Sequence, residues 1–144
     1  MNNQTALLAP CGLHCGMCPL YKALSDEKLR GTLSQRMNLP PEKAQCEGCR
    51  AVDGNCPVIG ERCATYICVE EKDVDFCSDC SEFPCSKLLP CTDRAESLPH
   101  NLKIYSLTLR KLKGEQAWNQ MIGQIYSLYY RGQMVIGRGP VPRT

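Results

Sequence analysis

One segment of the chain, residues 46–85, reads CEGCRAVDGNCPVIGERCATYICVEEKDVDFCSDCSEFPC and contains eight of the twelve cysteines but no leucine. A segment so poor in large apolar side chains buries too little surface to offset the conformational entropy lost on folding. Metal ions bound by four thiolates contribute roughly 10 to 16 kcal/mol per structural zinc in small peptides, which is enough to order such a segment. We therefore expect metal binding to replace an apolar core here.

The compartment decides whether these cysteines are ligands or disulfides. The N-terminus has no basic segment, and its longest apolar run, residues 6–10, is shorter than the roughly 7 to 15 residues of a signal peptide. Elsewhere the sequence has no apolar run of about 20 residues, so no membrane span is expected. We expect a cytoplasmic protein with reduced thiols, because glutathione and thioredoxin keep cytosolic cysteines reduced.

The cysteine spacing predicts metal ligands. Three pairs share the C-x2-C spacing, at which two thiolates from one tight turn reach the same ion: Cys15 with Cys18, Cys46 with Cys49, and Cys77 with Cys80. Zinc is the expected metal, and a 4Fe-4S cluster is the alternative because it accepts the same four thiolates. All twelve cysteines are candidate ligands: Cys11, Cys15, Cys18, Cys46, Cys49, Cys56, Cys63, Cys68, Cys77, Cys80, Cys85 and Cys91.

Helix geometry suggests how these ligands divide among ions. Cys63 and Cys68 are five residues apart, and five helical steps rotate a side chain by about 140°, so the two are expected to serve different ions. Grouping each C-x2-C pair with its nearest cysteines gives two sets of four: 46, 49, 56 and 63, then 68, 77, 80 and 85. The other four, 11, 15, 18 and 91, form a third site only if the chain folds back on itself. Two sites with a few cysteines left over is the other option, and His14 or His100 can replace a thiolate in either scheme.

Helical patterns lie on either side of residues 46–85, the centre of a cysteine-rich region that we place at residues 9–91. Ahead of its centre, Ser25 is a candidate N-cap for a helix whose apolar positions are Leu29, Leu33 and Met37 and which ends before Pro40. After it, residues 100–132 predict a helical hairpin. The first apolar stripe, ending at Gly114, consists of Leu102, Tyr105, Leu109 and Leu112.

The second helix of the hairpin is expected over residues 116–131, ending at Gly132. Residues 133–144 are expected as a tail that holds either a short strand or an ordered loop. The fold class is therefore a small α-rich domain with irregular loops, in which a metal-stapled region is joined to a C-terminal helical hairpin. We expect residues 1–144 to form a single domain.

Several motifs resemble a known family. APCGLHCGMCP (residues 9–19), CEGCR (46–50) and residues 63–85 carry the patterns CGLxCxxCP, CxGC and CxxCxEFPC of a cysteine-rich family of unknown function from bacteria and archaea. LLPCTDRAESLPHNLKIYSL (88–107) and YYRGQMVIGRGP (129–140) resemble its longer members. The resemblance implies zinc binding and no assigned activity. Relatives often have Asp or Tyr at the position of His14, which weakens this histidine as a ligand.

The function classes can be weighed from these observations. Closed tetrathiolate sites favour a non-catalytic structural zinc protein that acts through interactions, and the alternative is an iron–sulfur protein in electron transfer or redox sensing. No catalytic constellation is recognisable, so no catalytic residue is assigned. Cys49 beside Arg50 is the best candidate for a reactive thiol, but a ligand role is favoured.

Charge bears on the expected partners. Three zinc sites, each carrying about −2 with its four thiolates, would change the formal net charge of +2 to about −4. Nucleic acid is therefore an unlikely partner, no membrane is expected, and an unidentified protein partner is allowed. The basic positions around Lys103, Arg110, Lys111 and Lys113 are interpreted as the solvated face of a helix.

Overall fold

The computed structural model describes residues 5–88 and 101–144. Over these residues the chain forms six α-helices and one two-stranded antiparallel sheet, which confirms a small α-rich fold with irregular loops. The helices are α1 (Pro19–Lys22), α2 (Glu27–Met37), α3 (Ala64–Glu71), α4 (Leu102–Lys113), α5 (Glu115–Gln120) and α6 (Ile122–Arg131), and the strands are β1 (Gln133–Val135) and β2 (Gly139–Val141). Short 3-10 turns punctuate the loops: η1 (Thr5–Leu7), η2 (Cys15–Met17), η3 (Pro41–Lys43), η4 (Cys77–Asp79) and η5 (Ser86–Leu88).

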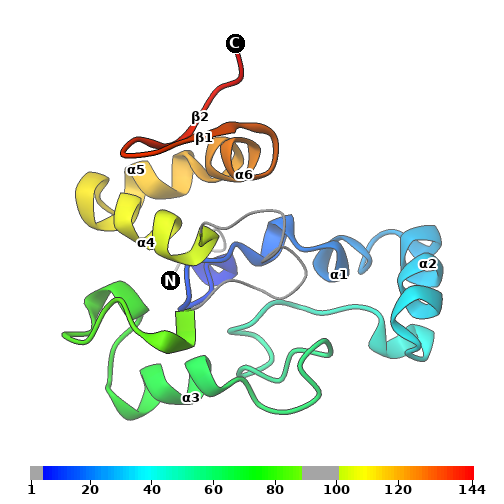
Figure 1. Ribbon diagram of the computed structural model, residues 1–144. Coiled ribbons are helices and arrows are strands. Elements are labelled where there is room, and N and C mark those ends of the chain that lie inside the picture. Colours follow the sequence, from blue (N-terminus) through cyan, green and yellow to red (C-terminus); the bar gives the residue numbers. More distant parts are fainter. Residues whose placement is uncertain (1–4, 89–100) are drawn as a thin grey trace.

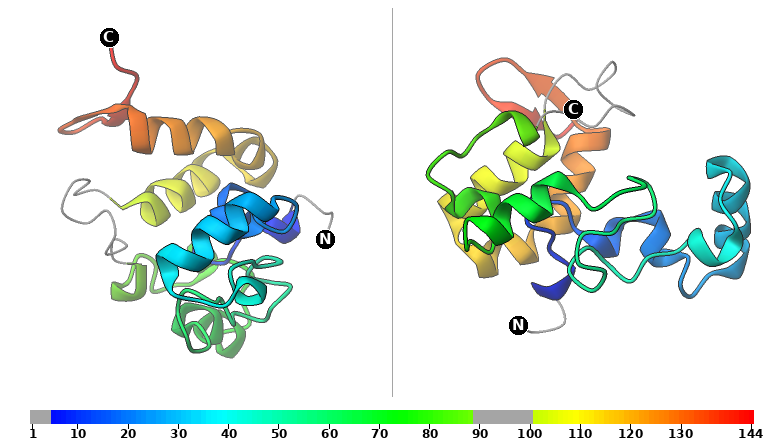
Figure 2. Two further views of the ribbon diagram at one scale, coloured as in Figure 1. Left: turned by 90° about the vertical axis from the view of Figure 1, so that its right-hand side faces the viewer. Right: turned by 90° about the horizontal axis from the view of Figure 1, so that it is seen from below.

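The C-terminal helices and α3 lie on opposite sides of the N-terminal segment, residues 5–18 (Figure 1). Figure 1 shows α4, α5 and α6 together with the β-hairpin above this segment and α3 below it. Helix α2 stands away from the rest of the molecule in both Figure 1 and Figure 2, and none of its residues is buried. No helix among the described residues is long and apolar enough to cross a membrane.

The core lies where the two parts meet. Trp118 of α5 is fully buried and contacts Phe76 edge to face, with ring centroids 5.4 Å apart. Such aromatic pairs contribute about 0.5 to 1.5 kcal/mol beyond the burial of their area. The buried residues around them come from both parts of the chain: Leu8, Val69, Leu88, Leu102, Leu107, Ile122, Ile125 and Tyr129.

A buried hydrogen-bond chain ties α4 and α5 to the N-terminal loop. The Trp118 Nε1 donates to Ser106 Oγ at 2.9 Å, and Ser106 Oγ donates to the carbonyl oxygen of Gly12 at 2.8 Å. Gly12 has φ +90°, and a Cβ there would lie 2.8 Å from Leu107 Cγ, so only glycine fits against the helix. The loop that carries the first cysteines is therefore positioned by the C-terminal helices.

Two sequence predictions about helix ends need correction. Helix α2 is capped by Asp26, whose Oδ1 accepts from the backbone N of Leu29 at 2.9 Å, and Ser25 lies outside the helix. Asp is as good an N-cap as Ser, so neighbouring candidates cannot be separated by type alone. The helix expected over 116–131 is two helices, because the backbone turns at Met121 between α5 and α6.

The C-terminal end also differs in detail from the expectation. Leu112, assigned to the apolar stripe of α4, is 74% exposed, since it follows the last turn that packs on the core. Residues 133–144 contain a β-hairpin in which Gln133 pairs with Val141 and Val135 with Gly139. The second strand begins with Gly and Pro, residues that rarely indicate a strand, which explains why the sequence pattern did not predict it.

Candidate metal centre

The cysteines of the described chain fall into two groups, one around a cavity and one around the contact between two loops. The ten cysteines from residue 15 to residue 85 are free thiols. Cys91 and His100, which the sequence included among the candidate ligands, lie outside the described residues.

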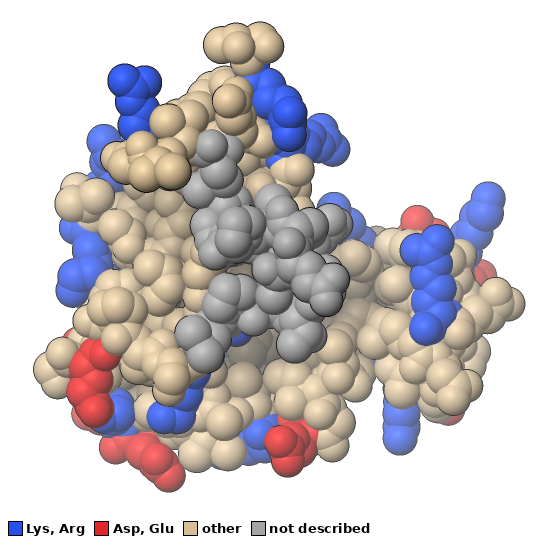
Figure 3. Space-filling model, in the orientation of Figure 1, with Lys and Arg blue, Asp and Glu red and all other residues tan. Residues whose placement is uncertain are grey.

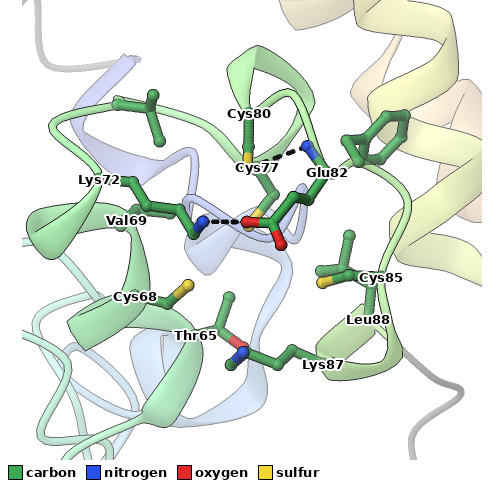
Figure 4. A pocket seen from close by; sticks show the side chains of 12 residues that line it. Thr65, Cys68, Val69, Lys72, Cys77, Cys80, Glu82, Cys85, Lys87 and Leu88 are labelled. Carbon is green, nitrogen blue, oxygen red and sulfur yellow. Dashed lines mark hydrogen bonds and ion pairs between the residues drawn. The ribbon is translucent and has the colours of Figure 1, made fainter.

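One group lines a cavity that we call the thiol pocket, defined by Cys68, Cys77, Cys80 and Cys85. Cys68 lies on α3, Cys77 and Cys80 lie at the two ends of η4, and Cys85 precedes η5. Figure 4 shows the four side chains around one space, whose volume is about 60 Å³. Spacing alone had grouped the same four cysteines.

The thiols of the pocket lie close enough to interact electrostatically. The pKa of Cys77 is raised to about 12, chiefly by burial and then by the charges of Cys11, Cys85, Cys68 and Cys80. In the absence of a cation, the Cys77 thiol is therefore neutral at physiological pH. A cation in the pocket would oppose both effects, because it stabilises the thiolate form.

Polar groups around the thiol pocket were not predicted from the sequence. The backbone N of Glu82 donates to Cys80 Sγ at 3.4 Å. The Glu82 carboxylate pairs with the ammonium group of Lys72, and the ion pair crosses the pocket in Figure 4. No motif marks Lys72, because only the fold brings the end of α3 to the turn after Cys80.

The second group is built on two loops that are far apart in sequence. Cys49 donates its backbone N–H to Cys15 Sγ at 3.2 Å, so the first two C-x2-C turns are in contact. Cys56 and Cys63 lie near this contact, since the Cys63 charge acts on Cys49 and the pKa of Cys56, raised first by burial, is raised further by the charge of Cys46.

Cys63 and Cys68 face different groups, as their helical spacing predicted. Cys63 is the N-cap of α3 and acts electrostatically on Cys49, whereas Cys68 lines the thiol pocket. The Cys11 charge raises the pKa of both Cys49 and Cys77, in each case after the larger effect of burial. Cys11 therefore lies within electrostatic range of both groups.

The arrangement of the potential ligand side chains can be compared with that of a metal site. Over residues 5–88 and 101–144, no three or more His, Cys, Asp or Glu side chains are arranged as they stand to hold a metal ion. His14 has a buried Nδ1 without a hydrogen-bond partner, and burial lowers its pKa, so the ring is neutral. The backbone N of His14 donates to the Tyr126 hydroxyl at 2.9 Å, which ties this loop to α6.

Two arginines link the groups of cysteines to the core. Arg50 donates from Nε to the carbonyl oxygen of Leu8 at 2.8 Å, and its guanidinium lies 4.9 Å from the centre of the Phe76 ring. Burial raises the pKa of Cys49 to about 12, so this thiol lacks the lowered pKa of a nucleophile despite its neighbour Arg50.

The second arginine corrects the interpretation of the basic helix face. The Arg110 side chain is only 14% exposed, and its Nη1 donates to Ser78 Oγ at 2.8 Å and to Asp79 Oδ1 at 2.6 Å. Its guanidinium also lies 4.2 Å from the centre of the Phe76 ring. Arg110 is therefore a structural contact between α4 and η4 and no part of a solvated face.

Surface charge is unevenly divided along the chain. Residues 101–144 contain seven Lys or Arg and one Glu, a net of +6, whereas residues 5–88 contain nine Lys or Arg and twelve Asp or Glu, a net of −3. Figure 3 shows basic side chains around the upper part of one face and acidic side chains along its lower edge. The formal net charge of +2 conceals this division.

The fold and the two groups of thiols define a class, a small helical protein whose cysteine-rich loops gather free thiols. The chain belongs to the family described as "Protein of unknown function (DUF3795)", which matches residues 7–90. The matched residues include every described cysteine, and α4 to β2 follow them in the chain. No curated protein and no solved structure matches the chain.

Proposed function

We propose that this chain is a structural metal protein that binds one zinc ion in the thiol pocket and acts through interactions with other molecules rather than through catalysis. The observation that carries the proposal is the convergence of four thiols on one cavity. These cysteines belong to a segment of 40 residues that contains no leucine, and three of them, Cys77, Cys80 and Cys85, lie at its end.

The donor set suits zinc. Four sulfur ligands are the commonest composition of closed structural zinc sites, which leave no open position for a substrate. A bound zinc ion supplies folding free energy, about 10 to 16 kcal/mol in small peptides. The N–H of Glu82 directed at Cys80, and the ammonium group of Lys72, favour negative charge on the sulfurs.

Binding requires the four thiols to approach one another, and their side chains allow this. A cysteine side chain moves its sulfur by rotation about a single bond, so small changes reposition the donors. The segment that carries them consists of a short helix and 3-10 turns, which adjust at little cost. Coupling of metal binding to local ordering is the usual behaviour of small thiolate sites.

The size of the cavity argues against a small-molecule substrate. Its volume of about 60 Å³ is far below the roughly 300 to 1,000 Å³ of pockets that bind small organic ligands. Elsewhere in residues 46–85, the side chains of Val58 and Ile59 are 61% and 46% exposed, and such apolar side chains offer contacts to a protein partner.

Metal analysis tests the proposal. Protein purified without oxygen is expected to be colourless and to contain zinc, and Cys85→Ser is expected to lower the zinc content by about one equivalent, because it removes one of four ligands. Cys85 is exposed, so serine leaves the core unchanged. Its neighbour Ser86 provides the control Ser86→Ala, which should keep all the zinc.

Three outcomes would overturn the proposal. A Cys85→Ser variant with unchanged zinc content would show that the thiol pocket holds no ion. Protein without any bound metal would show that the thiols themselves are the functional groups. A brown protein with iron, acid-labile sulfide and broad visible absorption would replace structural zinc by an iron–sulfur cluster.

A further inference from the structure

The two C-x2-C turns outside the thiol pocket lie side by side and run in opposite directions. The backbone N of Cys46 donates to the carbonyl oxygen of Leu20 at 3.0 Å, and the backbone N of Cys49 donates to Cys15 Sγ at 3.2 Å. The start of the second turn thus meets a residue just after the first turn, and the end of the second turn meets the start of the first, so the two turns are antiparallel. Cys18 therefore lies toward Cys46, and Cys15 lies toward Cys49.

Gly48 lies against the first turn. It has φ +110°, and a Cβ built there would lie 3.6 Å from Cys15 Cβ and 3.9 Å from Cys15 Sγ, which are ordinary van der Waals distances. A residue with a side chain would be strained in this backbone conformation. The second turn therefore requires glycine for its backbone, and it passes within contact distance of Cys15.

The electrostatic interactions cross between the turns in the same way. The pKa of Cys15 is raised to about 11, chiefly by burial, with the N–H of Cys49 lowering it and the charges of Cys11, Cys18 and Cys46 raising it by smaller amounts. The charge of Cys15 contributes in turn to the raised pKa of Cys49, after burial and the charge of Cys11.

Cys56 and Cys63 lie beside this arrangement. The pKa of Cys56, raised first by burial, is raised further by the charges of Cys46 and Cys18, and both Cys63 and Cys56 act on Cys49 after burial, Cys11 and Cys15. The backbone N of Cys63 donates to the Gly54 carbonyl oxygen, and the Gly54 N donates to the Cys49 carbonyl oxygen. Each flanking cysteine is single, whereas each turn offers two thiolates to the same ion.

We propose that Cys15, Cys18, Cys46 and Cys49 form a second metal site, which takes a divalent ion of the zinc class, with Cys56 and Cys63 outside its ligand set. The choice of a zinc-class ion rests on the proposed function, but the four sulfur atoms of the second site are not those of the thiol pocket. This partition differs from the one predicted by spacing, which assigned Cys56 and Cys63 to the ion of Cys46 and Cys49. The partition differs because backbone contacts bring the turn of Cys15 and Cys18 against the turn of Cys46 and Cys49.

Zinc content with cadmium-113 NMR of the cadmium-substituted full chain tests the second site. Wild-type protein is expected to bind about two ions and to give two signals in the tetrathiolate range. Cys18→Ser should lose about one ion and one signal, whereas the matched control Cys63→Ser should keep both. Cys85→Ser should lose the other signal, which identifies it with the thiol pocket.

A second measurement keeps the test valid if Cys18→Ser does not fold. In wild-type protein loaded with zinc, a thiol-alkylating reagent followed by peptide mapping should modify Cys56 and Cys63 while the four proposed ligands stay protected. Loss of an ion in Cys63→Ser with retention in Cys18→Ser, or protection of Cys56 and Cys63, would overturn the second site. Wild-type protein with a single ion that only Cys85→Ser removes would also overturn it but leave the proposed function intact. A single ion that only Cys18→Ser removes would support the second site and contradict the thiol pocket.

Discussion

The cysteine-rich region and the C-terminal helices are ordered by different means. In α4 to α6 the chain buries large apolar side chains, with Trp118 and Ile125 fully inaccessible and only one acidic residue in the whole segment. Residues 46–85 bury few apolar side chains, and their regular structure is limited to α3 and short turns. The comparison teaches that apolar burial accounts for the order of one part of the chain and for much less of the order of the other.

The largest effect on this difference between the two regions is expected from removal of metal. A chelator that strips zinc should abolish hydrogen-exchange protection in residues 46–85, because the loss is on the order of 10 kcal/mol per site. Helices α4 to α6 should retain protection, since their order comes from apolar burial. Unchanged protection in the cysteine-rich region would show that its loops are ordered without metal.

The converse change targets the conventional core. Trp118→Ala should lower the free energy of unfolding by about 3 to 5 kcal/mol, because it leaves a cavity beside Phe76 and removes the hydrogen bond to Ser106. Denaturant unfolding followed by far-UV circular dichroism measures the loss. Leu112→Ala, at an exposed position, is the control and should change stability by less than about 0.5 kcal/mol.

The contact of Arg110 with η4 is expected to contribute to the free energy of unfolding. Arg110→Met should cost about 2 kcal/mol, because it removes charge-assisted hydrogen bonds to Ser78 and Asp79 while keeping an apolar stem against Phe76. Lys113→Met, at an exposed position near the end of α4, serves as the control. If both variants unfold at the same denaturant concentration as wild type, Arg110 does not hold the two parts together.

The smallest effect is expected at the mouth of the thiol pocket. Lys72→Met should change stability by less than about 1 kcal/mol, since its ion pair with Glu82 is largely exposed. It should nevertheless speed zinc transfer to a competing chelator by about threefold, because it removes a positive charge beside the thiolates. Arg62→Met breaks the ion pair between Arg62, which precedes α3, and Glu70 of α3, away from the residues that line the pocket, and should leave the rate unchanged.

Much of the helical part follows from local sequence patterns. The apolar stripes and the glycines at 114 and 132 predicted where α4 begins to pack and where α4 and α6 end, because helix periodicity and glycine termination act over a few residues. The turn at Met121 and the hairpin after α6 were not predicted. Both depend on packing against α4 and α6 rather than on local preference.

The candidate sites were predicted unevenly. The four cysteines of the thiol pocket are neighbours in sequence order, so spacing grouped them. The contact between the turn of Cys15 and the turn of Cys49 joins residues 34 positions apart, and spacing carries no information about such an approach. Arg110 was misinterpreted for a similar reason, since its partners Ser78 and Asp79 lie in another part of the chain.

The ring of Phe76 gives the molecule a means of communication. Phe76 precedes Cys77 of the thiol pocket, and the guanidinium of Arg50, the residue after Cys49, lies over the same ring. If the two proposed sites take metal, a shift of either cysteine would pass through this ring to the neighbour of the other. The coupling between the two ions would then be reciprocal, so that each would change the affinity for the other by the same factor.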